Sequence, residues 1–117
     1  MTARILVVED EFFIAQEIAD ALAGAGYEVV GPFARVARAL EQLEKEPCDA
    51  AVLDVSLRNE SSLQVAQWLA LRNIPYLVVT GFSLAQLPQE MRATSVLAKP
   101  LAAADLTGAL KAILPAD

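Results

Sequence analysis

Three acidic residues follow an apolar run near the start of the chain. The stretch ILVVEDE places Glu9, Asp10 and Glu11 directly after residues 5–8. Another acid, Asp54, ends the apolar run in DAAVLD. Carboxylate oxygens are the ligands that hard cations such as Mg²⁺ prefer. Carboxylates that are brought close together repel one another unless a proton or a cation neutralises them.

A hydroxyl and an ammonium group occupy similar positions further along. Thr80 ends the run YLVVT, and Lys99 follows VLA and precedes Pro100. The sequence thus adds a positive charge and a hydroxyl hydrogen-bond donor to the acids that follow the earlier apolar runs. The chemistry requires that one fold bring all of these groups together.

Short apolar runs alternate with stretches of helical spacing along the whole chain. This alternation predicts an α/β fold with a parallel sheet that is covered by helices on both faces. Right-handed crossovers then give a doubly wound, flavodoxin-like (βα)5 domain whose five strands have the order 2-1-3-4-5. The predicted strands are Ile5–Val8, Tyr27–Val30, Ala50–Leu53, Tyr76–Val79 and Val96–Ala98.

Four segments have clear helical spacing, and a fifth has only a weak helical pattern. The four cover the regions from Phe13 to Leu22, Val36 to Leu43, Leu63 to Leu71, and Leu101 to Leu114. In the weak segment, Ser83–Met91, helical spacing is interrupted by Pro88, and a proline inside a helix costs about 3 kcal/mol or more. We expect a short helix there. Ser61 and Ser62 are expected to cap the third helix.

In a sheet of this order, ligands bind outside the carboxyl ends of the strands, where the order reverses. The prediction therefore brings Glu9, Asp10, Asp54, Thr80 and Lys99 to one site. Carboxylates about 4 Å apart repel by roughly 4 kcal/mol per pair at an effective dielectric of 20. Either a carboxylate keeps a proton or a cation neutralises the group. Mg²⁺ is the expected cation.

Composition narrows the possible functions. The chain has 117 residues, a net charge of −6, 56% hydrophobic residues, one cysteine and no histidine. The length predicts one domain, residues 1–117. The charge argues against nucleic-acid binding, and the lack of histidine argues against a zinc site. No stretch approaches a membrane helix or a signal peptide. A lone cysteine fits a reducing compartment, so the cytoplasm is expected.

The ordered motifs ILVVEDE, DAAVLDVSL, YLVVTG and VLAKP resemble the receiver domain of bacterial two-component response regulators, over Ile5 to Leu114. The resemblance implies that Asp54 accepts a phosphoryl group from a histidine kinase or histidine phosphotransferase. Mg²⁺ would be bound by Asp10, Asp54, the backbone carbonyl of Ser56 and, mainly through water, Glu9. Lys99 and Thr80 would contact phosphoryl oxygens. Receivers generally have a cis peptide at the position of Lys99–Pro100.

Departures from the family pattern bear on how the signal is read. Receivers often carry Tyr or Phe three residues before the lysine, where this chain has Val96, which cannot make the same inward rotation. The acceptor loop, DVSLRNESS, lacks the usual methionine-proline. With VVTGF, these features resemble a receiver subgroup that has a Phe-Ala-Thr-Gly-type motif and partners HWE-class kinases. We expect phosphorylation to order the segment from Thr80 to Met91.

Several functions fit this interpretation. The leading one is a stand-alone phosphorylation switch without an output domain, not a metabolic enzyme, that dephosphorylates itself slowly and signals by contact with a downstream protein. A phosphate sink that drains a shared kinase and a phosphorylation-independent adaptor are alternatives. A flavodoxin-like enzyme is disfavoured because acids after the first strand would repel a cofactor phosphate.

Simpler roles are expected for residues around the motifs. We expect Glu11 to stabilise the start of the first helix through its charge. Phe13 and Cys48 are expected to fill the core. Trp68 is expected to pack on the third helix.

Overall fold

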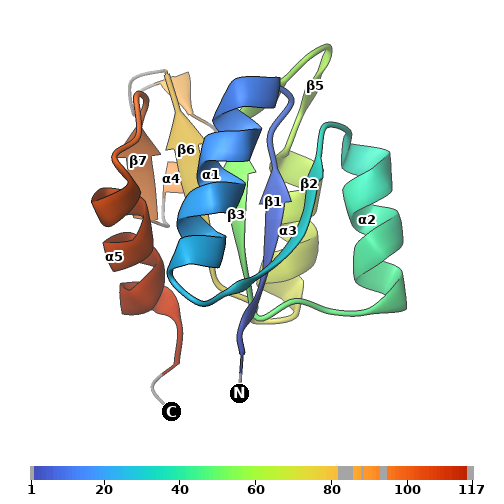
Figure 1. Ribbon diagram of the computed structural model, residues 1–117. Coiled ribbons are helices and arrows are strands. Elements are labelled where there is room, and N and C mark those ends of the chain that lie inside the picture. The colour runs from blue at the N-terminus through green and yellow to red at the C-terminus, as the bar shows by residue number, and fades with distance from the viewer. Residues whose placement is uncertain (1, 82–85, 88, 93–94, 116–117) are drawn as a thin grey trace.

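The structure is a computed structural model that describes residues 2–81, 86–87, 89–92 and 95–115 (Figure 1). Its central sheet contains the strands β1 (Arg4–Val8), β2 (Glu28–Phe33), β3 (Ala50–Asp54), β6 (Tyr76–Thr80) and β7 (Ser95–Ala98). The strands are parallel and have the order β2-β1-β3-β6-β7. Counted within this sheet, that is the predicted order 2-1-3-4-5, so the doubly wound fold is confirmed.

The middle of the sheet is buried on both faces. Every residue of β3 and β6 is buried, as are the last four residues of β1. Side chains of successive strand residues point to opposite faces, so a strand covered on both sides must be apolar throughout. This explains why these strands appear in the sequence as unbroken apolar runs rather than as alternating patterns.

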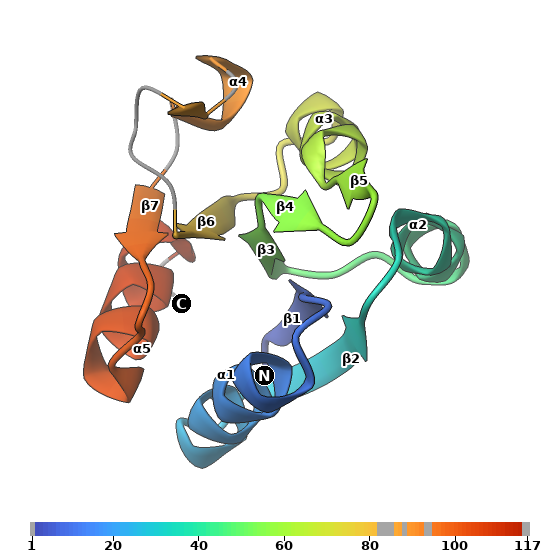
Figure 2. The same ribbon diagram turned by 90° about the horizontal axis from the view of Figure 1, so that it is seen from above.

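Helices cover the two faces in different numbers (Figure 2). On one face, α1 (Phe12–Gly24) packs beside α5 (Ala103–Ile113) over a core that includes Ile18, Leu22 and Leu106. On the other lie α2 (Val36–Lys45), α3 (Leu63–Leu71) and the short α4 (Gln89–Arg92). Within the described residues, no helix has the length and apolar character needed to cross a membrane.

The weak fourth helix is short, as predicted. Four residues form α4, and Leu87 and Met91 bury their side chains in the core on the α2 and α3 side. Val96 packs partly buried against the same core. Residues 82–85 and 88, which include the rest of the predicted segment and the final residue of the VVTGF motif, lie outside the described residues. The expected ordering of this segment on phosphorylation stays a prediction.

A small antiparallel hairpin was not predicted. It consists of β4 (Ser56–Leu57) and β5 (Glu60–Ser61) and follows β3 immediately. Asn59 in its turn has φ 63, in the left-handed region that asparagine tolerates better than most residues. Two strands of two residues are too short to show a period in the sequence, so the loop after Asp54 gave no signal for a hairpin.

Two expectations about single residues have different outcomes. Cys48 is buried, as predicted. Phe13 does not fill the core: it is 79% exposed, beside the exposed Phe12, because both lie on the outer side of the first turn of α1. The buried face of this helix consists instead of Ala15, Ile18 and Leu22.

Candidate functional site

Three carboxylates meet at the carboxyl edge of the sheet. Glu9 and Asp10 follow β1, and Asp54 is the last residue of β3, the next strand in the sheet. One oxygen from each lies within 4.8 Å of the others. Glu9 and Asp54 are buried, whereas Asp10 is partly exposed. The geometry therefore brings together the three acids that the sequence singled out.

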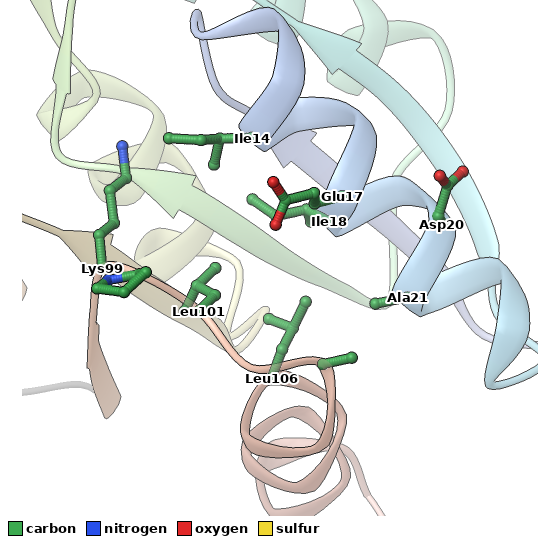
Figure 3. A pocket seen from close by; sticks show the side chains of 10 residues that line it. Ile14, Glu17, Ile18, Asp20, Ala21, Lys99, Leu101 and Leu106 are labelled. Atoms are coloured by element: carbon green, nitrogen blue, oxygen red, sulfur yellow. The ribbon is translucent and has the colours of Figure 1, made fainter.

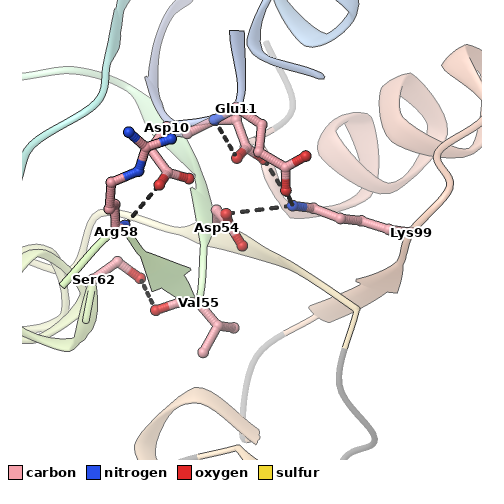
Figure 4. Close-up of polar contacts among 8 residues, drawn as sticks. Asp10, Glu11, Asp54, Val55, Arg58, Ser62 and Lys99 are labelled. Carbon is pink, nitrogen blue, oxygen red and sulfur yellow. Dashed lines mark hydrogen bonds and ion pairs between the residues drawn. The ribbon is translucent and has the colours of Figure 1, made fainter. Parts of the chain in front are cut away.

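Lys99 reaches this cluster from the end of β7. Its Nζ lies 3.1 Å from Oε1 of Glu9 and 3.3 Å from Oδ2 of Asp54. Figure 4 shows its side chain extending toward Asp54 and Glu11. Burial opposes the charged form of Lys99, but attraction to Asp54 and Glu9 outweighs it and raises the pKa of the ammonium above its ordinary value. The lysine therefore stays charged and offsets part of the repulsion between the acids.

Glu9 is a buried carboxylate whose charged form is disfavoured by its surroundings. Burial, together with a hydrogen bond and charge repulsion involving Asp54, raises the pKa of Glu9 from 4.5 to about 7. The backbone N–H of Glu11 donates to Oε2 of Glu9 at 3.2 Å, and Lys99 favours its charged form, but these do not outweigh burial. Without a cation, the site is therefore poised to hold a proton near neutral pH.

Asp10 is tied to the hairpin rather than to Lys99. Its Oδ2 accepts a hydrogen bond from the backbone N–H of Arg58 at 2.6 Å (Figure 4). Arg58 lies between β4 and β5, so the loop after Asp54 is held against Asp10, the second residue after β1. Ser56 begins β4, two residues after Asp54. The expected role of its backbone carbonyl as a metal ligand stays a prediction.

Thr80 occupies the end of β6, between the strands that carry Asp54 and Lys99. It is 2% exposed. Its backbone carbonyl accepts a hydrogen bond from the N–H of Lys99 at 2.9 Å. The peptide bond between Lys99 and Pro100 is cis, as expected. All five residues predicted to meet at the strand ends thus lie at one edge of the sheet.

The donor set fits a hard divalent cation. The candidate ligand atoms are carboxylate oxygens, and Mg²⁺ prefers oxygen ligands. Among the described residues, Oε1 of Glu9 is the buried side-chain oxygen that accepts no hydrogen bond, although it lies near the ammonium of Lys99. A cation would neutralise the cluster that burial and repulsion otherwise leave partly protonated. The acidic cluster is therefore compatible with Mg²⁺.

Sequence reasoning missed one member of the site. Glu11 forms no side-chain cap on α1; its Oε1 instead lies 3.4 Å from Nζ of Lys99. The expected caps of α3 are found in part. Ser61 Oγ accepts a hydrogen bond from the N–H of Leu63, the first residue of α3. Ser62 forms no side-chain cap, because its Oγ donates to the carbonyl of Val55. A third consecutive acid near the predicted lysine was the only signal that could have indicated the contact of Glu11.

A largely apolar groove of about 660 Å³ begins beside the site. Figure 3 shows Ile14, Ile18 and Ala21 on α1 facing Leu101 and Leu106, with Lys99 at one end of the groove. Glu17 and Asp20 add negative charge along its α1 side. The aliphatic part of Lys99 thus borders the groove while its ammonium enters the acid cluster.

Comparison with known proteins identifies the family of this chain. The family described as the response regulator receiver domain matches residues 5–111. The chain therefore belongs to the receiver domain family of response regulators. Its fold is the CheY-like fold: CheY4 of Vibrio cholerae superposes with a TM-score of 0.86 and 26% identity, covering 97% of this chain and all of that one.

Proteins with higher sequence identity to this chain are found among solved structures and among curated sequences. SdrG from Sphingomonas melonis Fr1 is 40% identical, with a TM-score of 0.84 over 96% of each chain. The transcriptional regulatory protein PdtaR of Mycobacterium tuberculosis is 32% identical over 112 residues, which are 92% of this chain and 55% of PdtaR. The chain thus spans about half the length of that relative. The polar-differentiation response regulator DivK of Brucella ovis is 30% identical over 72% of this chain and 71% of DivK.

Proposed function

We propose that this chain is a phosphorylation switch that accepts a phosphoryl group on Asp54 and signals through contact with another protein. The observation that carries the proposal is the placement of Asp54. Its carboxylate ends β3 beside Glu9 and Asp10, and Oδ2 lies 3.3 Å from the ammonium of Lys99. This is a nucleophile with anionic neighbours on one side and a fixed positive charge on the other.

The proposed transfer is a single displacement at phosphorus. A carboxylate oxygen of Asp54 attacks the phosphorus of a phosphohistidine, and the P–O bond forms as the P–N bond breaks. The electron pair of the broken bond stays on the imidazole nitrogen of the donor. Lys99 neutralises charge on one phosphoryl oxygen, and the hydroxyl of Thr80 donates a hydrogen bond to another. The later attack of water on phosphorus returns Asp54 and releases phosphate.

Mg²⁺ would be held by Asp10, Asp54 and the carbonyl of Ser56, with Glu9 acting mainly through a bound water. When bound, it supplies positive charge for the carboxylates and the phosphoryl oxygens. The hydrogen bond from the backbone N–H of Arg58 would hold the carboxylate of Asp10 in place beside the cluster. Glu9 would lose its proton when the cation binds, because the cation favours the charged carboxylate.

The partners follow from the family and from the site. The phosphodonor is a histidine kinase or a histidine phosphotransferase, and the readout is a protein contact rather than a catalytic step. The partial match of VVTG to the Phe-Ala-Thr-Gly-type motif, together with Val96, supports a donor of the HWE class. We assign the chain no metabolic reaction beyond slow loss of its own phosphoryl group.

Phosphorylation with a small-molecule donor tests the proposal directly. The chain is incubated with acetyl phosphate and Mg²⁺, and intact mass and Phos-tag electrophoresis report one added phosphoryl group. The same assay with phosphorylated histidine kinases of the source organism ranks the donors. We expect wild type to be modified, and we expect Asp54→Asn to remain unmodified because an amide is not a competent nucleophile.

Asp20→Asn is the matched control because Asp20 lies on α1, outside the acid cluster. It should be modified like wild type. Modification of Asp54→Asn to the wild-type level would contradict the proposal, as would a wild-type chain that stays unmodified with every donor.

A further inference from the structure

Lys99 has a third acidic partner that differs from the other two. Its Nζ lies 3.4 Å from Oε1 of Glu11, almost as close as it lies to Glu9 and Asp54. The side chains of Glu9 and Asp54 are 0% and 6% exposed, but that of Glu11 is 62% exposed. Glu11 therefore holds the ammonium from the solvent side of the site.

Glu11 lies outside the carboxylate group that could bind a cation. That group consists of Glu9, Asp10 and Asp54. Glu11 also forms no side-chain cap on α1, although its backbone carbonyl accepts a hydrogen bond from Ala15. Its carboxylate thus has a contact with Lys99 without the structural duties of a helix cap or a place in the metal cluster.

The contact with Lys99 has a consequence for the proposed reaction. A phosphoryl group on Asp54 needs the ammonium of Lys99, which Glu11 already engages. Glu11 and Oδ2 of Asp54 both lie within 3.4 Å of the same nitrogen, so a dianionic group on Asp54 would also be repelled by Glu11. The carboxylate of Glu11 competes for the ammonium of Lys99 and repels the incoming negative charge. Both effects weaken binding of a phosphoryl group at Asp54.

We propose that Glu11 is a positioning residue that holds Lys99 in its resting place and thereby weakens binding of a phosphoryl group at Asp54. This inference rests on the proposed function of Asp54. Because Oε1 of Glu11 and Oδ2 of Asp54 lie 3.4 and 3.3 Å from one nitrogen, the two oxygens are at most about 7 Å apart. Neutralising Glu11 should therefore strengthen binding of an anion at Asp54 roughly three- to tenfold at low ionic strength. The ratio of the two binding constants should fall toward one at about 1 M salt, where the screening length is about 3 Å.

Beryllofluoride is a suitable probe because it mimics a phosphoryl group, and a BeF3-activated conformation of SdrG has been solved. Its dissociation constant is measured by calorimetry with saturating Mg²⁺ for wild type and for Glu11→Gln, at low salt and at about 1 M salt. Glu44→Gln is the control: Glu44 is exposed on α2, and the variant changes net charge by the same amount. We expect tighter binding only for Glu11→Gln, and only at low salt.

The outcomes separate this inference from the proposed function. A wild-type chain that binds no beryllofluoride overturns the proposed function, and the role of Glu11 with it. If wild type binds but Glu11→Gln matches Glu44→Gln, or binds more weakly than wild type, only the role of Glu11 fails. A gain that persists undiminished at high salt would also overturn it, because competition between charges must be screened.

Discussion

Buried carboxylates make the stability of this protein depend on what neutralises them. Glu9 is buried against Asp54, and its pKa of about 7 means that the folded state holds a proton that the unfolded chain releases near 4.5. The stabilising effect of that proton is present below about pH 4.5 and is lost as the pH rises through about 7. A cation replaces the proton and removes this dependence.

We predict that, in EDTA, the melting temperature falls by several degrees between about pH 5.5 and 8, since a loss of one kcal/mol lowers it by roughly 3–5 °C at this size. Millimolar Mg²⁺ should raise the melting temperature most at the alkaline end. Thermal unfolding followed by circular dichroism over this range, with and without Mg²⁺, measures both effects.

The variant Glu9→Gln tests whether Glu9 causes the predicted pH dependence of the melting temperature. Its amide cannot ionise, so the alkaline decline in EDTA should largely disappear, whereas Glu44→Gln should retain it. A decline of the same size in Glu9→Gln would show that another group is responsible.

At the scale of elements, the hairpin β4–β5 links the loop after Asp54 to the start of α2. Its Glu60 carboxylate accepts hydrogen bonds from Nε of Arg35 at 2.7 Å and from the backbone N–H of Val36 at 3.2 Å. Val36 is the first residue of α2, where backbone N–H groups lack helical partners. Glu60 thus caps α2 from a distant element, while Arg58 in the same hairpin binds Asp10.

The hydrogen bonds from Arg35 and Val36 lower the pKa of Glu60 below its ordinary value. The stability that its charge provides is present above the ordinary pKa and is lost as the pH falls through the lowered one. Glu60→Gln should therefore lower the melting temperature by a few degrees at neutral pH and match wild type in strong acid. Thermal melts across the acid range test this sign.

The control for this prediction is Glu41→Gln. Glu41 forms an exposed pair with Lys45 on α2 at 3.8 Å, a geometry that contributes little to stability. It should change the melting temperature less than Glu60→Gln does. An equal effect of the two variants at neutral pH would mean that the hairpin contact does not cap α2.

At the scale of the molecule, helices on both faces stabilise the sheet that positions the site. Leu69 and Leu71 lie on the same helix, α3, but Leu69 is 0% exposed and Leu71 is 81% exposed. Leu69→Ala should destabilise the protein by about 2–5 kcal/mol, because it leaves a cavity in the core. Leu71→Ala should change stability by less than about 0.5 kcal/mol. Urea unfolding of the three proteins tests this; similar losses for both variants would contradict the packing.

Patterns in the sequence were sufficient for the sheet and for most of the site. Apolar runs that are buried on both faces predict parallel strands, and the strand ends of such a sheet must share an edge. That rule placed Asp54 beside Glu9 and Asp10 and brought Lys99 to them from the end of the last strand. The match between predicted and observed strand order follows from the same physics.

What only the tertiary structure decided are contacts that depend on side-chain direction and on exact element ends. Glu11 and Lys99 are 88 positions apart, and nothing in either local pattern says that their side chains meet. Phe13 has a large apolar side chain of the kind that usually fills a core. The orientation of α1 about its axis nevertheless leaves it exposed to solvent. The hairpin is linked to Asp10 and to α2 by hydrogen bonds that the backbone N–H groups of Arg58 and Val36 donate. Every residue except proline carries such a group, so these contacts leave little trace in a sequence.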